Sequence, residues 1–172
     1  ILKGATESLQ ECSLVEVEAE FFAQYKDQPL FHEVMEFMLD CNFELLYLNR
    51  VIQQRRKYAG FSKGQLVFGD ALFVRRDDAL DGLDEQKLVR LMVLLINYGH
   101  LDRVFDLLAT QPLNEETRRI FNSYLRWRIG RWKIRRLKQR AIPLVDKFVL
   151  WLLHLRKHNS LTIDSDRSWP IR

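Results

Sequence analysis

The segment 12–25 (CSLVEVEAEFFAQY) contains the clearest β pattern in the chain, because polar and apolar residues alternate over 15–21. In an extended segment Glu16, Glu18 and Glu20 share one face, while the residues between them are apolar and share the other. This period of two predicts a β-strand over 13–21 that has one acidic face. The glutamates lie toward the carboxyl end of the strand, which is where open α/β sheets bind their ligands.

The pattern that follows alternates between helix and strand. Apolar residues recur at helical spacing over 30–40, which predicts an amphipathic helix, and Asn42 is suited to its left-handed end. Short apolar runs predict strands over 43–48 and 64–76, separated by a basic loop over 50–63. A strand, a helix and two further strands predict the last part of an α/β sheet, with the final two strands paired antiparallel.

Helical patterns occupy the rest of the chain. The expected helices share apolar residues at helical spacing and cover 84–98, 100–109, 115–140 and 143–157. Gly99 is suited to end the first of them, and Asn114 is suited to cap the third. The change of pattern predicts an α/β part at 1–78 and a basic helical accessory region at 79–172.

Charge is distributed unevenly along the chain. Residues 1–80 carry 9 Lys and Arg against 13 Asp and Glu, whereas residues 81–172 carry 18 against 10. Ten of these basic residues fall within 118–140, which contains no acid and includes Trp127 and Trp132. Three interpretations of this basic helix stay open. It is a solvated helix whose Arg stems cover apolar surface, a helix attached to an anionic membrane, or a helix that binds nucleic-acid phosphates.

The sequence disfavours a membrane-spanning segment, a secretory signal and a metal site. No apolar run approaches the roughly 18–20 residues that span a bilayer, and no secretory signal is present. The expected location is the cytoplasm, with peripheral attachment to a membrane as an alternative. Cys12 and Cys41 lack metal or redox spacing, which predicts free thiols. His154 and His158 stand four residues apart without a third ligand nearby in sequence, so no metal site is expected.

Four segments in the first part of the chain carry a family resemblance. They are LKGA at 2–5, VEVEAEFFAQY at 15–25, PLFHEVMEFMLDCNFELL at 29–46 and DALFVRR at 70–76. Taken together, they resemble the C-terminal part of the FkbM family of methyltransferases. Asn42 departs from the family by standing where glycine is usual. The resemblance covers about residues 1–76 and does not extend to residues 77–172.

The resemblance implies a class I, Rossmann-like methyltransferase fold, S-adenosylmethionine as cofactor, and methylation of a hydroxyl on a glycan or small metabolite. Class I enzymes hold the cofactor on a glycine-rich loop at the first βα turn. The seven glycines of this chain include no G-x-G pair. The cofactor-binding half is therefore expected to lie outside these residues, and the chain is expected to be a fragment that is inactive by itself.

Glu18 and Asp70 are the catalytic candidates, and no cofactor-binding or metal-binding residue is expected within the chain. Glu18 matches the family's recurrent glutamate, and Tyr25 matches a later tyrosine. A carboxylate at a strand end can accept the proton of a substrate hydroxyl, hold the substrate or orient a loop; the alternative is a solvated strand residue. For Asp70, the alternative is a turn or bulge residue beside Gly69 that stabilises the strand pair.

The rival to an enzyme part is a non-catalytic interaction module whose basic helices bind an anionic membrane or nucleic acid. A strand and a glycine-rich turn encoded upstream of Ile1 would favour the enzyme part, and their absence would favour the module. Glu16 and Glu20 are expected to face solvent.

Overall fold

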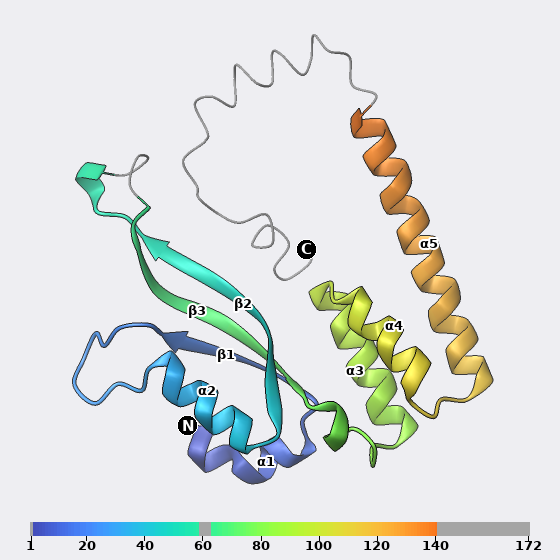
Figure 1. The fold of residues 1–172 in the computed structure, drawn as a ribbon, viewed down its shortest axis with the longest axis horizontal. Coiled ribbons are helices and arrows are strands. Elements are labelled where there is room, and N and C mark those ends of the chain that lie inside the picture. The colour runs from blue at the N-terminus through green and yellow to red at the C-terminus, as the bar shows by residue number, and fades with distance from the viewer. Residues whose placement is uncertain (1, 59–62, 141–172) are drawn as a thin grey trace. The chain divides into compact units, whose positions relative to one another are not determined.

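The computed structural model describes the backbone of residues 2–58 and 63–140, and the side chains of these residues except 58 and 135–140. The chain divides between His100 and Leu101 into two compact units. Figure 1 labels the helices and strands of both. The first unit contains a β-sheet with helices, and the described part of the second is helical. The domain boundary expected at residue 78 stays a prediction.

The sheet consists of β1 (Leu14–Glu20), β2 (Phe43–Gln53) and β3 (Gln65–Arg75), in the order β1-β3-β2. The last of these strands in sequence lies in the middle and is antiparallel to both neighbours, so β1 and β2 run parallel to each other. Helix α2 (Phe31–Asp40) connects these two outer strands. The prediction of a mixed α/β fold whose last two strands pair antiparallel is therefore confirmed.

Strand β2 is longer than the strand expected at 43–48. Residues up to Gln53 continue to pair with β3, so the first part of the expected basic loop is strand. The 3-10 helix η2 (Arg56–Tyr58) follows it. The expectation was wrong at this point because Arg50 interrupts the apolar run, whereas pairing with β3 keeps the backbone extended.

The pairing of β1 with β3 is regular from Leu14, opposite Val74, to Glu20, opposite Phe68. Gly69 lies inside this regular stretch and does not form the bulge that the sequence allowed. A Cβ atom at Gly69 would lie 2.7 Å from the backbone oxygen of Asn49 on β2. The close approach of the β2 backbone is therefore the reason for a glycine within this strand.

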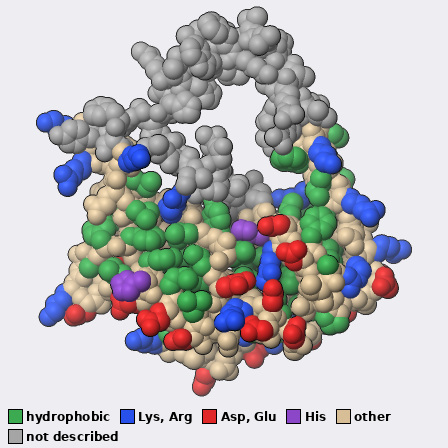
Figure 2. Space-filling model, viewed as in Figure 1, with side chains coloured by type: hydrophobic (Ala, Val, Ile, Leu, Met, Phe, Trp, Pro, Cys, Tyr) green, Lys and Arg blue, Asp and Glu red, His purple; other side chains and the backbone are tan. Residues whose placement is uncertain are grey.

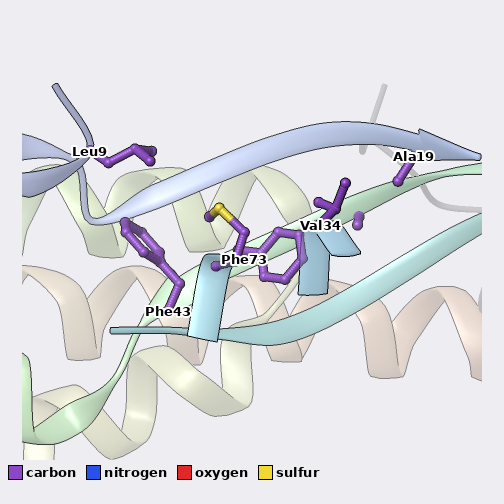
Figure 3. Packing of buried hydrophobic residues seen from close by; sticks show 7 residues of the cluster. Leu9, Ala19, Val34, Phe43 and Phe73 are labelled. Atoms are coloured by element: carbon purple, nitrogen blue, oxygen red, sulfur yellow. The ribbon is translucent and has the colours of Figure 1, made fainter. Parts of the chain in front are cut away.

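One face of the sheet packs against helices. A buried cluster draws on α1 (Thr6–Glu11), α2 and all three strands and comprises Leu9, Ala19, Val34, Met38, Phe43, Ala71 and Phe73 (Figure 3). Val15 and Val17 of β1 pack against this cluster. Because side chains alternate along a strand, the glutamates of β1 lie on the opposite face.

Arg75 ties the end of β3 to the helix that begins the chain. This helix, α1, follows the 3-10 helix η1 (Leu2–Ala5). The guanidinium of Arg75 donates hydrogen bonds to the backbone oxygens of Leu9 at 2.7 Å, Gln10 at 2.8 Å and Cys12 at 2.9 Å. These oxygens belong to the last turn of α1 and the residue after it, and the oxygen of Leu9 also accepts from the amide of Cys12 at 3.1 Å.

Asn42 forms the turn between α2 and β2. Its φ angle is 64°, in the left-handed region, and its amide donates to the oxygen of Leu39 at 3.0 Å. Its own carbonyl accepts from the amide of Arg76 at 3.0 Å, which joins the turn to the end of β3. The left-handed end predicted at Asn42 is confirmed.

Helix α3 (Glu85–Tyr98) follows a short 3-10 helix, η3 (Asp77–Ala79). Asp84 caps α3 by accepting a hydrogen bond from the amide of Lys87 at 2.8 Å, and Gly99 ends it with a φ angle of 91°. The helix predicted at this place and its glycine end are both confirmed.

The second unit contains α4 (Leu101–Thr110) and α5 (Glu115–Arg140). The side chain of Asn114 accepts a hydrogen bond from the amide of Thr117 at 2.7 Å, as predicted for a cap. The helix expected at 143–157 lies outside the described residues, as does the pair of histidines within and after it.

Candidate functional site

The strand register brings together the two catalytic candidates. Glu18 of β1 is directly opposite Asp70 of β3, and Asp70 is directly opposite Asn49 of β2. Side chains that are opposite each other in neighbouring strands share a face and have Cβ atoms about 5 Å apart. Glu18, Asp70 and Asn49 therefore form a polar row across all three strands, on the face away from α2.

Within this polar row, Asp70 is fixed by a hydrogen bond and Glu18 is exposed to solvent. The side-chain amide of Asn49 donates a hydrogen bond to a carboxylate oxygen of Asp70 at 3.1 Å, and Asp70 is half-buried. Glu18 is exposed. Like charges that face each other across a sheet are destabilising, so this placement carries a local cost in stability. Costs of this kind are concentrated at functional sites.

Tyr98, the last residue of α3, lies next to the polar row. Its hydroxyl donates a hydrogen bond to the carboxylate of Glu16. Burial raises the pKa of Tyr98 to about 12, with further contributions from the hydrogen bond to Glu16 and from the charges of Glu16 and Asp70. Tyr98 is therefore a proton donor, and not a base, at neutral pH.

The end of α3 covers the part of the sheet adjacent to the polar row. The neighbouring row, which is nearer to the start of β1, consists of Glu16, Leu72 and Tyr47. Tyr98 contacts Glu16, and the ring of His100 lies edge-on to the ring of Tyr47 with centroids 5.7 Å apart. The polar row is the next row toward the end of β1, and its Glu18 is exposed. The polar row therefore lies at the edge of the area that α3 covers.

The other residues singled out in the sequence lie outside the polar row. Glu16 is exposed, as expected, although it accepts the hydrogen bond from Tyr98. Glu20 is half-buried and accepts a hydrogen bond from the side chain of Gln24 at 3.2 Å, so the expectation that it faces solvent holds only in part. Tyr25 is 66% exposed.

Sequence reasoning missed two members of the site. Asn49 lies one residue beyond the strand that was expected to end at 48, and only the longer β2 places it opposite Asp70. Tyr98 had no signal beyond its position as the last residue before Gly99. Its role depends on where α3 crosses the sheet, which a single sequence does not specify.

The polar row suits hydrogen bonding and proton transfer with a hydroxyl. Glu18 can accept a proton, and Asp70 with Asn49 offers an acceptor and a donor to a second hydroxyl. Three or more potential metal ligands do not gather anywhere in the described residues. Neither residues 2–58 nor 63–140 contain a helix with the length and apolar character needed to cross a bilayer.

The fold of the first unit defines a mixed α/β protein with a small antiparallel sheet and an acidic row on one face. Comparisons with protein-family models, with curated proteins and with solved structures give no match.

Proposed function

We propose that the first unit is the closing part of a class I methyltransferase sheet, and that its polar row receives the hydroxyl that is methylated. The resemblance of residues 2–76 to the FkbM family suggested this class. A sheet of this class ends with two parallel strands joined by a helix and a last, antiparallel strand between them. The strand order β1-β3-β2, with α2 as the connection, agrees with that arrangement.

The outer edge of β1 supports the proposal. Among the described residues, β1 pairs along its length with β3 alone, and Glu20 makes one isolated parallel bridge to Leu30. Val15 and Val17 are only half-buried although they face the helical layer. A further parallel strand at this edge, followed by its own helix, would pair the backbone and cover these side chains.

The cofactor needs residues that the chain does not supply. Its glycines include no pair at the spacing of an adenosyl-binding loop. We therefore assign the S-adenosylmethionine site to sequence outside residues 1–172, on the strands that would continue the sheet beyond β1. The cofactor would supply the methyl group, and the residues of this chain would act on the acceptor.

The polar row gives each residue a role toward the acceptor. Glu18, exposed at the strand end, accepts the proton that the acceptor hydroxyl loses. Asp70, held by Asn49, accepts a hydrogen bond from a neighbouring hydroxyl and fixes the orientation of the acceptor. An acceptor with two adjacent hydroxyls, such as a glycan or a small polyol, suits this arrangement. The observation that carries the assignment is the direct opposition of Glu18 and Asp70 in the β1–β3 register.

Glu18→Gln tests the proposal in the complete protein encoded by the reading frame that contains residues 1–172. The substitution keeps the shape of the side chain but removes its charge and basicity. We expect methyl transfer from radiolabelled S-adenosylmethionine to a deproteinised glycan and metabolite extract to fall about 10²–10⁴-fold. The affinity for the cofactor should stay unchanged, because Glu18 acts on the acceptor.

Glu36→Gln is the matched control, since Glu36 is exposed on α2, on the other side of the sheet. It should retain the parent rate. Equal rates for the parent and the Glu18→Gln protein would assign Glu18 to structure, and a parent protein without any transfer would remove the methyltransferase proposal.

A further inference from the structure

One side of α5 is buried, and the opposite side carries an exposed apolar stripe. Phe121 and Leu125, four residues apart, are 8% and 0% exposed. Ile120, Trp127 and Ile134 are 57%, 55% and 57% exposed. Residues seven apart lie on the same face after nearly two helical turns, so these three form a stripe along α5. Large apolar side chains exposed in a row indicate a surface that binds a partner.

A basic stripe runs beside the apolar one. Arg119, Arg126 and Lys133 also recur every seven residues, each one position before a member of the apolar stripe, and all three are exposed. Figure 2 shows Lys and Arg side chains along the length of α5. Within the part of the chain that the structure describes, these three cations make no hydrogen bond or ion pair. Their charge is therefore available to an anionic partner.

Other cations of α5 make contacts with neighbouring groups. Arg118 donates to the backbone oxygen of Gln111 at 3.2 Å, and Arg128 donates to the hydroxyl of Tyr124 at 2.8 Å. The guanidinium of Arg131 lies 4.9 Å from the centre of the Trp127 ring. The basic residues of α5 are spread around the whole helix. Arg119, Arg126 and Lys133, however, all lie along one side of it.

We propose that the two stripes together, Arg119, Ile120, Arg126, Trp127, Lys133 and Ile134, bind an anionic lipid surface. This set is called the stripe surface. An indole is suited to the headgroup level of a bilayer, and isoleucine side chains can enter the acyl boundary beside it. Cations at the same level are attracted to anionic headgroups. The basic and the apolar side chains of the stripe surface therefore both favour an anionic lipid surface.

A nucleic acid fits the stripe surface less well. Binding to single strands depends on aromatic rings that stack on successive bases. The apolar stripe contains one ring, Trp127, with isoleucines on either side of it. That ring contacts the ring of Tyr124, and Arg131 already lies over it. Trp132, another exposed ring of α5, lies on a different side of the helix. Isoleucine adds nothing to base stacking, whereas it adds apolar area that lipid can bury.

Co-sedimentation of chain 1–172 with phosphatidylcholine vesicles, with and without phosphatidylserine, tests this inference. We expect binding to the anionic vesicles only, and weaker binding at high salt. Arg119→Gln/Arg126→Gln/Lys133→Gln should weaken binding on the order of 100-fold at low salt. Ile120→Ser/Ile134→Ser should weaken it as well, while keeping every charge. Circular dichroism checks that both variants remain folded.

The matched control removes the same charge elsewhere, as Lys26→Gln/Arg55→Gln/Arg56→Gln, three exposed residues of the first unit. It should bind as the parent does. Equal loss in both triple variants, equal binding to neutral vesicles, or no binding to either kind would overturn the inference. Binding of a labelled RNA or DNA oligonucleotide through the stripe surface, without binding to vesicles, would overturn it in favour of nucleic acid. None of these outcomes depends on the methyltransferase proposal.

Discussion

Tyr98 connects α3 to the acidic face of the sheet through a hydrogen bond from its hydroxyl to the carboxylate of Glu16. Burial of the phenol disfavours its charged form, and the neighbouring carboxylates disfavour it further. Tyr98 consequently stays protonated near Glu16 and Asp70, where it can donate a hydrogen bond but does not act as a base at neutral pH. This division leaves proton acceptance at the site to the carboxylates.

The raised pKa of Tyr98 predicts how the stability of the protein depends on alkaline pH. Because the folded state favours the protonated phenol, this contribution is complete below the ordinary pKa of 10.0 and is lost as pH rises toward about 12. The difference in unfolding free energy between the parent and Tyr98→Phe should therefore change between these pH values. Urea unfolding on both sides of this window measures it, and a difference that is constant across the window would contradict the assigned pKa.

Asn42 shows how one residue can replace another at a fixed backbone conformation. The FkbM resemblance has glycine at this position, and the φ angle of 64° explains why. Glycine adopts the left-handed region without steric cost, and asparagine is among the few other residues that visit it readily. An asparagine at this position therefore suits the turn that joins α2 to β2.

At the scale of elements, the polar row depends on how closely β2 approaches β3. Gly69 is adjacent to Asp70, and any side chain there would contact the backbone of Asn49. The same approach lets the Asn49 side chain reach the Asp70 carboxylate. The backbone contact and the geometry of the site are thus linked through one glycine.

Gly69→Ala should separate β2 from β3 beside the site. Its Cβ would lie 2.7 Å from a backbone oxygen, so we expect a loss of about 1–3 kcal/mol in unfolding free energy. Gly82→Ala is the control, because a Cβ atom there meets nothing within 4 Å, and it should change stability by less than about 0.5 kcal/mol. Urea unfolding of both variants decides the matter, and equal stabilities would argue against the close approach.

The sequence predicted elements that local patterns define. Alternation identified β1, helical spacing identified α2 and α3, and the ends at Asn42 and Gly99 followed from left-handed conformations. It did not predict the extension of β2, because pairing with β3 overrides the local preference of Arg50 and its neighbours.

The sequence predicted which two carboxylates belong to the candidate site, but not how they are arranged in space. Glu18 was found from its place at a strand end, and Asp70 from its place in a strand with a family motif. Their opposition depends on β3 lying between β1 and β2, a long-range pairing that residue patterns do not fix. Tyr98 depends in addition on the path of α3 over the sheet.

At the scale of the whole molecule, the two units offer different surfaces. The first presents the polar row and the outer edge of β1, where the described residues supply an isolated bridge between Glu20 and Leu30. The second presents α5, with its unengaged cations beside an apolar stripe. The division of charge between the two parts of the sequence matches this difference: acidic residues exceed basic ones in the first part, and the reverse holds in the second.

Our central proposal is that this chain completes a methyltransferase whose cofactor site lies in sequence outside residues 1–172. Isothermal titration calorimetry with S-adenosylmethionine tests it most directly, because it requires no knowledge of the acceptor. The account predicts negligible binding to chain 1–172 and a site of micromolar affinity on the complete protein encoded by its reading frame. A micromolar site on chain 1–172 itself, or no site on the complete protein, would contradict it.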